Sequence, residues 1–294
     1  MTRGPLMIEL DQISFGWPDA PPVQRDLTLG IGAGEKLVLL GGNGSGKSTL
    51  LQLLAALVFA RTGQYRYGGQ LVTEAGARRG DWARRFRRQV GIVFQHPEAM
   101  LFNATVRDEI AYGPRRLAQA DAVERAEHWA LQLGLGALLD RPPHSLSGGE
   151  KQKLALACVL VLEPALLLLD EPAANLDPKT AGWLSEYLLD TPATVVMSTH
   201  NLSMAAEFGD RCVVPEQDAG ILFDGALAEA TVDVELMVRA GLAWRHRHRH
   251  RHRHHPHRAE VAATATSTGD VGLATAVEHA HEHLHWQVPA PRDR

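Results

Sequence analysis

The stretch GGNGSGKS, Gly41 to Ser48, places the strongest constraint on what this chain can fold into. It follows KLVLL (36–40), an apolar run typical of a buried strand, and it leads into a helical pattern at 47–59. The spacing fits G-x-x-x-x-G-K-[ST] in the strand–loop–helix context that this pattern requires. Glycines let backbone N–H groups converge on phosphate oxygens, and a helix N-terminus adds its positive end. The sequence therefore predicts a phosphate-binding loop.

Short strands alternate with helices along the rest of the chain. MIELDQISFGW (7–17) alternates apolar and polar residues, as a half-buried strand does. LLLLD (166–170) and TVVMSTH (194–200) are apolar runs suited to a sheet buried on both faces. Further expected elements are helices at 121–139 and 154–162 and a closing strand and helix within 219–242. This alternation predicts an α/β fold with a parallel sheet.

A carboxylate pair follows the strand at 166–170. Asp170 ends this buried strand, where a charge is costly unless it serves a cation, and its natural partner is the Mg²⁺ of a bound nucleotide. Ser48 can hold the same ion, and Lys47 can reach the β- and γ-phosphates. Glu171 then stands beside the γ-phosphate as a candidate general base, a role typically worth about 10²–10⁴-fold in rate.

Charge and composition exclude several other classes of protein. The formal net charge is −4, although residues 245–258 hold six arginines and no acid, so the rest of the chain is acidic and we expect no nucleic-acid partner. The N-terminus MTRGPLMIEL lacks the apolar segment of a signal peptide, and we expect no membrane-spanning segment. Cys158 and Cys212 are expected to be buried, reduced thiols.

The stretch LSGGE (146–150) makes the resemblance specific. With the two motifs above, it resembles the signature motif of the ATP-binding subunits of ABC transporters, where the last residue is usually Gln. The resemblance implies a P-loop NTPase core with an N-terminal antiparallel β-subdomain and an inserted α-helical signature subdomain. It also implies an ATPase that uses ATP and Mg²⁺ and forms a dimer. Glu150 departs from the usual Gln, and Ser147 and Glu150 also fit a capping box.

Further positions match that family one by one. Trp17 stands where an aromatic residue stacks on adenine, although it also suits a half-buried strand. Gln95 matches the residue that senses Mg²⁺, His200 the switch histidine at the γ-phosphate, and Asp177 the aspartate at the dimer interface. The implied catalytic residues are Lys47, Glu171 and His200, and the implied Mg²⁺ ligands are Ser48, Gln95 and Asp170. The resemblance implies that the signature residues Ser147, Gly148 and Gly149 act on the ATP of the partner subunit. The full set of implied nucleotide-binding residues is Trp17, Gly41, Gly42, Asn43, Gly44, Ser45, Gly46, Lys47, Ser48, Thr49, Gln95, Ser147, Gly148, Gly149, Asp170 and Asp177.

A narrower resemblance concerns the class of cargo. VGIVFQHPEAMLFNATVRDEIAYGP (90–114) looks like the stretch after the glutamine loop in energy-coupling-factor ATPases, especially those serving cobalt and nickel uptake. The implied partners are a second ATPase subunit, identical or different, a transmembrane scaffold protein that contacts 95–113, and a substrate-binding membrane protein. The implied location is the cytoplasmic face of the cell membrane. A vitamin such as biotin remains an alternative cargo.

Two other classes of function fit the sequence less well than the importer does. Soluble ABC proteins of DNA repair carry long coiled-coil insertions, and 49–169 shows no sustained heptads; those of translation join two ATPase units, and this chain has one. A metal-storage protein with vestigial hydrolysis would not need Lys47, Asp170, Glu171 and His200 together.

The composition changes sharply near residue 243, which predicts an ATPase domain over 1–242 and a His/Arg-rich, mostly disordered tail over 243–294. Eleven of the 15 histidines lie at 246–285. Imidazole suits nickel, cobalt, zinc and copper, so we expect Ni²⁺ or Co²⁺ to bind here, with 273–286 offering i,i+4 pairs if it is helical. Arginine-driven attachment to anionic lipid and a tract without function remain open. The candidate tail ligands are His246, His248, His250, His252, His254, His255, His279, His281, His283 and His285.

Overall fold

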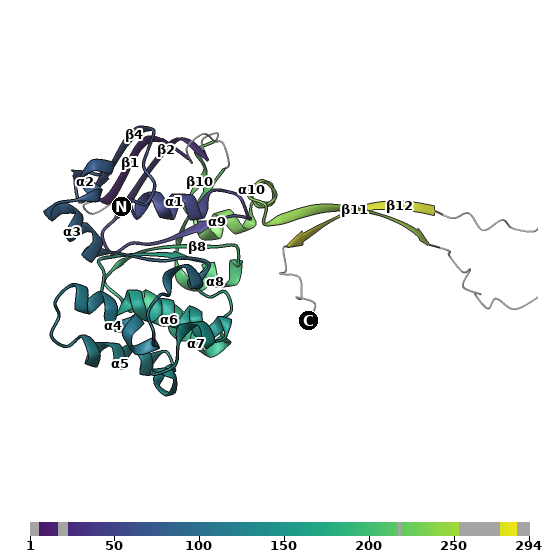
Figure 1. The fold of residues 1–294 in the computed structure, drawn as a ribbon. Helices are drawn as coiled ribbons and strands as arrows, with labels where there is room; N and C mark the ends of the chain where they lie inside the picture. Colours follow the sequence, from purple (N-terminus) through teal and green to yellow (C-terminus); the bar gives the residue numbers. More distant parts are fainter. Residues whose placement is uncertain (1–5, 17–22, 217–218, 253–276, 287–294) are drawn as a thin grey trace, which may run out of the picture. The chain divides into compact units, whose positions relative to one another are not determined.

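A computed structural model of the chain describes residues 6–16, 23–216, 219–252 and 277–286 (Figure 1). It divides into two compact units, residues 1–241 and 242–294. Trp17, His254 and His255 lie outside the described residues. Among the helices that are described, none combines the length and apolar character that crossing a membrane requires.

The first unit begins with a four-stranded antiparallel sheet in the order β2-β1-β4-β5. Its strands are β1 (Leu6–Phe15), β2 (Gln24–Gly32), β4 (Thr62–Tyr67) and β5 (Gln70–Leu71). The alternation expected over 7–17 appears in β1, where Ile8, Leu10 and Ile13 are buried while Glu9 and Asp11 are less covered. This sheet is the predicted N-terminal antiparallel subdomain.

A six-stranded sheet in the order β10-β9-β3-β8-β7-β6 forms the centre of the unit. Its strands are β3 (Lys36–Leu40), β6 (Val90–Val93), β7 (Leu166–Asp170), β8 (Thr194–Thr199), β9 (Arg211–Pro215) and β10 (Ile221–Ala226). Every residue of β7 and β8 is buried, as their unbroken apolar runs predict. Neighbouring strands are parallel except β10, which pairs antiparallel with β9 at the edge. The predicted parallel α/β core is confirmed.

Helices cover the central sheet and form a separate lobe. In Figure 1, α4, α5 and α6 lie together away from the antiparallel sheet, and they contact one another, as expected for the inserted helical subdomain. The helices of this unit are α1 (Lys47–Leu54), α2 (Glu74–Arg78), α3 (Asp81–Gln89), α4 (Val106–Arg116), α5 (Ala122–Gln132), α6 (Gly148–Leu160), α7 (Pro178–Asp190), α8 (Leu202–Phe208), α9 (Leu227–Val232) and α10 (Val234–Arg239).

Some helix boundaries differ from the sequence-based expectations for local reasons. The helix expected at 154–162 begins at Gly148, because Ser147 caps it. The helix expected over 121–139 ends at Gln132, just before Gly134, whose φ of 72° belongs to the left-handed region. The single closing helix is two, α9 and α10, because the Asp233 carboxylate accepts the Leu236 N–H at 2.9 Å and starts a new helix.

The hydrophobic core joins the two sheets through α1. Phe15 of the antiparallel sheet, Leu51 of α1 and Leu168 of the central sheet belong to one cluster and are fully buried. Burying a side chain of this size contributes typically about 1.5–3 kcal/mol. The core therefore fixes the loop between β3 and α1 against both sheets.

The second unit is a two-stranded antiparallel ribbon of β11 (Ala243–His252) and β12 (Val277–Trp286). The helical alternative for 273–286 is therefore wrong over 277–286, and the i,i+4 pairs His279/His283 and His281/His285 do not form. Alternation of polar and apolar residues in VEHAHEHLHW suits a strand, in which positions two apart share a face. Much of the tail lies outside the described residues, so its predicted disorder stays a prediction.

Candidate functional site

A glutamine of the antiparallel sheet supports the loop between β3 and α1. Gln24 on β2 is fully buried, and its Nε2 donates to the carbonyl oxygen of Ser45 at 3.1 Å. Gly46 has a φ of 92°, and a Cβ there would lie 2.7 Å from Gln24 Nε2. Only glycine satisfies both the left-handed backbone and the close approach.

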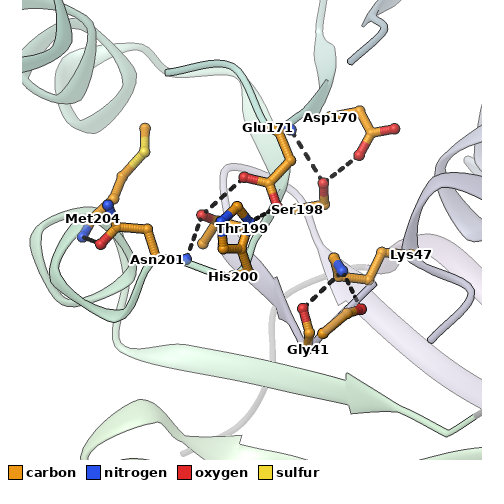
Figure 2. Close-up of polar contacts among 10 residues, drawn as sticks. Gly41, Lys47, Asp170, Glu171, Ser198, Thr199, His200, Asn201 and Met204 are labelled. Atoms are coloured by element: carbon orange, nitrogen blue, oxygen red, sulfur yellow. Dashed lines mark hydrogen bonds and ion pairs between the residues drawn. The ribbon is translucent and has the colours of Figure 1, made fainter. Parts of the chain in front are cut away.

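Lys47 is the first residue of α1 and is almost completely buried, with 6% of its surface exposed. Its Nζ donates to the carbonyl oxygens of Gly41 at 2.8 Å and Gly42 at 2.9 Å (Figure 2). Burial lowers the pKa of Lys47, while the nearby carboxylates of Glu171 and Asp170 act in the opposite direction. The ammonium group is thus folded back onto the carbonyl oxygens of its own loop, and the carboxylates of Glu171 and Asp170 are the nearby negative charges.

Asp170 and Glu171 are both positioned by Ser198 of the neighbouring strand. Asp170 ends β7 with 6% of its surface exposed and lies directly opposite Ser198 of β8. The Ser198 hydroxyl donates to the Asp170 carboxylate and accepts the Glu171 N–H at 3.2 Å (Figure 2). One buried hydroxyl therefore fixes the side chain of the first acid and the backbone of the second.

The Glu171 carboxylate faces the end of β8. Its Oε1 lies 2.7 Å from Nδ1 of His200, and its Oε2 accepts the Thr199 hydroxyl at 3.3 Å. Glu171 has a φ of 48°, a left-handed conformation that is uncommon for residues other than glycine. Strained backbone of this kind persists where the surroundings hold it, and it gathers at functional sites. Here the surrounding contacts direct the carboxylate toward the histidine.

These residues surround a cleft of about 470 Å³. It is lined by Val23, Asn43, Gly44, Ser45, Gly46, Lys47, Ser48, Thr49, Gln95, Asp170 and Glu171. Among the described side chains, the buried Ser45 Oγ has no hydrogen-bond partner. An unpartnered hydroxyl beside the start of α1 is an observation that a phosphate oxygen would explain.

The structure brings most of the predicted residues together, but not all of them. Of the described candidates, Gly41, Gly42, His200, Asp177 and Ser147–Gly149 do not line the cleft. Gly41 and Gly42 instead face Lys47 through their carbonyls, and His200 touches the cleft through Glu171. Ser147, Gly148 and Gly149 lie at the start of α6, and their predicted action on a second subunit stays a prediction.

The signature turn at the start of α6 is a complete capping box. The Ser147 hydroxyl accepts the Glu150 N–H at 3.4 Å, and the Glu150 carboxylate accepts the Ser147 N–H at 2.8 Å and its O–H at 2.7 Å. These bonds from Ser147 hold the pKa of Glu150 below its usual value. The capping role predicted for Glu150 is confirmed, and it occupies the donors of Ser147.

Asp177 connects the signature helix to the loop before α7. Its carboxylate caps α7 by accepting the Thr180 N–H at 2.9 Å, and it also accepts from Lys153 Nζ at 2.8 Å. The Lys153 and Thr180 donors lower the pKa of Asp177. A Cβ at Gly149 would lie 2.7 Å from the Asn175 carbonyl oxygen, so the turn and the loop are in close contact.

Three contributors were missed by the sequence analysis. Gln24, Ser198 and Lys153 have no motif of their own, and each acts on a motif far away in the sequence. Ser198 gave a weak signal, since it is a hydroxyl that follows the apolar run Val195–Met197 and lies two residues before the predicted histidine. Gln24 and Lys153 become informative only when the strands and helices are paired.

The fold and the cleft together define a P-loop nucleoside triphosphatase. A glycine loop runs from a parallel strand into a helix that starts with a buried lysine, and two acids stand at the end of another strand of the same sheet, with β8 between the two strands. An antiparallel sheet and a helical lobe with a capped SGG turn are added to this core. These two additions distinguish the chain from P-loop nucleoside triphosphatases that have the central core alone.

Comparison with known proteins gives the family. Residues 24–174 match the ABC transporter family, and the chain belongs to it. ATP-binding subunits of this family hydrolyse ATP, and the chain is such an ATPase. A nickel import ATP-binding protein, NikO, from Rhodobacter capsulatus is 42% identical over 247 residues, which cover 81% of this chain and 93% of that protein.

Two further relatives support the assignment. The energy-coupling factor transporter ATP-binding protein EcfA from Methanothermobacter thermautotrophicus is 34% identical over 241 residues, covering 80% of this chain and 76% of that protein. The structure of cbiO1 from Clostridium perfringens, part of the ABC transporter complex cbiONQ, matches with a TM-score of 0.65 and 26% identity. That match covers 79% of this chain and 93% of the other. The resemblance to energy-coupling-factor ATPases is thereby confirmed.

Proposed function

We propose that this chain is the ATP-hydrolysing subunit of an energy-coupling-factor importer that takes up nickel or cobalt. The observation that carries the ATPase part is the Lys47, Asp170 and Glu171 cluster around one cleft. The observation that supports the cargo is 42% identity, over most of both chains, to a nickel import ATP-binding protein.

The cleft fits ATP with Mg²⁺. The orphaned Ser45 hydroxyl and the N–H groups at the start of α1 suit phosphate oxygens, and Lys47 exchanges its two carbonyl acceptors for the β- and γ-phosphates. Ser48, Gln95 and Asp170 supply the hard oxygen ligands that Mg²⁺ prefers. When bound, this ion neutralises charge on the phosphates. We also propose that Trp17, which lies outside the described residues, stacks on adenine.

Glu171 acts as the general base for the attacking water, and His200 contacts the γ-phosphate. The distance of 2.7 Å between Glu171 Oε1 and His200 Nδ1 holds the two groups against each other. Thr199 holds the second carboxylate oxygen at 3.3 Å. The geometry therefore gives the base a fixed direction before the nucleotide binds.

The active form is a dimer with two nucleotides at its interface. Ser147, Gly148 and Gly149 of one subunit contact the γ-phosphate bound by the partner, and Asp177 lies at the interface. The capped start of α6 supports this role, because its free N–H groups and positive end favour an anion. Formation of the dimer on ATP binding and its opening after hydrolysis drive the membrane proteins.

The segment 95–113 is the surface for the transmembrane scaffold protein. Phe102 and Tyr112 are 67% and 43% exposed, and their rings pack edge to face with centroids 4.9 Å apart. The buried Glu109 carboxylate accepts the N–H groups of Phe102 at 2.8 Å and Asn103 at 2.6 Å, which holds the loop in place. An exposed, braced aromatic pair suits a protein partner. The subunit then works at the cytoplasmic face of the membrane.

Reconstitution tests this proposal. The chain is purified together with its membrane partners and placed in lipid vesicles, and uptake of Ni²⁺, Co²⁺ and biotin is measured with and without ATP. We expect ATP-dependent accumulation of Ni²⁺ or Co²⁺, and none with the Lys47→Ala variant. Accumulation of biotin without either metal would contradict the cargo assignment.

A further inference from the structure

The ribbon of β11 and β12 aligns its histidines in a register that the sequence does not reveal. The pairing places His246 opposite His283, His248 opposite His281, and His250 opposite His279. His252 and His285 stand opposite Val277 and Trp244 at the two ends. Three successive rungs of the ribbon, each two residues apart, are therefore histidine pairs.

All of these histidine positions share one face of the ribbon. Directly opposed residues of an antiparallel pair lie on the same face, and positions two apart along a strand also do. The Cα atoms of such a pair are about 4.5–5.5 Å apart, and rungs of the same face follow at about 7 Å. Imidazole nitrogens bind transition metals at about 2.0–2.1 Å. One rung, or two adjacent rungs, thus lies within the span of a single ion.

The arginines occupy the other face. Arg247 is opposite Glu282 and Arg251 is opposite Glu278, while Arg245 and Arg249 are opposite Leu284 and Ala280. The register therefore separates the positive charges from the histidine positions and sets acids against two of the four arginines. Repulsion between the arginines and a dication is reduced accordingly.

We propose that the ribbon is a metal-binding site in which the directly opposed histidine pairs His246/His283, His248/His281 and His250/His279 chelate a divalent transition-metal ion such as Ni²⁺. A two-stranded ribbon by itself is marginally stable in water, so the metal stabilises the pairing that creates its own ligands. The residues of this site are not those of the nucleotide cleft, and the proposal does not depend on the proposed cargo.

Two double variants test the register, and each removes one histidine from each strand. His250→Ala with His279→Ala deletes one rung and leaves His246/His283 and His248/His281 intact. His250→Ala with His281→Ala removes the same number of histidines but leaves only His246/His283. NiCl₂ is titrated into the full chain by calorimetry, and the ATPase rate of each variant checks that the first unit is folded.

We expect the second variant to bind Ni²⁺ at least about tenfold more weakly than the first, because the first keeps two adjacent histidine pairs around one ion and the second keeps a single pair. Both variants should hydrolyse ATP at the rate of the unaltered chain. Equal affinity of the two variants would show that the number of histidines matters and not their register, which would overturn the proposal. Absence of Ni²⁺ binding by the unaltered chain would also overturn it. Neither result would bear on the ATPase assignment.

Discussion

Replacing Ser198 by alanine removes the hydroxyl that positions both acids of the cleft. The Asp170 carboxylate, buried at the end of β7, loses its donor, and a hydrogen bond to a charged group contributes typically about 1.5–3 kcal/mol. The Glu171 N–H keeps a second acceptor, the Ser198 carbonyl oxygen at 3.2 Å, so its loss is smaller. We therefore expect the free energy of unfolding to fall by about 1.5–3 kcal/mol.

The same substitution is expected to slow ATP turnover, because the left-handed backbone of Glu171 loses one of its supports. Unfolding in urea measures the first effect, and steady-state phosphate release measures the second. Ser203→Ala, at an exposed position of α8 whose hydroxyl makes no hydrogen bond in the described region, is the matched control. Unchanged stability and turnover in Ser198→Ala would refute the role assigned to this hydroxyl.

Three further predictions concern the loop and the signature turn. Gly46→Ala should weaken ATP binding and stability more than Gly44→Ala, because both glycines have a positive φ but only a Cβ at Gly46 would meet a buried neighbour, Gln24. Nucleotide titration and urea unfolding measure the two effects, and equal effects of the two variants would argue against that contact. The pKa of Asp177 is lowered in the folded protein, so its carboxylate contributes stability at pH values above its ordinary pKa of 3.8, and this stability is lost as the pH falls through the lower pKa of the folded state. Acid unfolding of Asp177→Asn should lack this component, and a profile identical to that of the unaltered chain would exclude it. Glu150→Gln should lower the ATP concentration needed for dimer formation, since a neutral acceptor releases the N–H and O–H donors of Ser147 more readily than a carboxylate does. Sedimentation at increasing ATP concentration measures this, and a higher ATP concentration needed by the variant would contradict it.

The central features of the fold could be predicted because they are local in the sequence. The glycine loop and the lysine that starts α1 lie within one stretch of eight residues, Gly41 to Ser48. The capping box likewise joins Ser147 to Glu150, three positions further along. The apolar runs Leu166–Leu169 of β7 and Val195–Met197 of β8 likewise contain the reason for the burial of these strands. Physical rules about single segments were sufficient for these elements.

The remaining features depend on pairing between distant segments. Gln24 supports the loop across 21 positions, and Ser198 reaches Asp170 across 28. No local pattern marks such a partner, because the contacts exist only after the antiparallel sheet has packed against the loop and β8 has paired with β7. The tail shows the same limit, since a histidine every second residue predicts a shared face within a strand but not the register of the other strand.

The central claim is that Glu171 activates water within a cleft that binds ATP by other groups. Glu171→Gln preserves the size of the side chain but removes its basicity, and binding and turnover of ATP by this variant test the claim most directly. We predict ATP binding close to that of the unaltered chain, turnover slowed by about 10²–10⁴-fold, and a stable dimer in the presence of ATP. Normal hydrolysis by the variant would contradict the account.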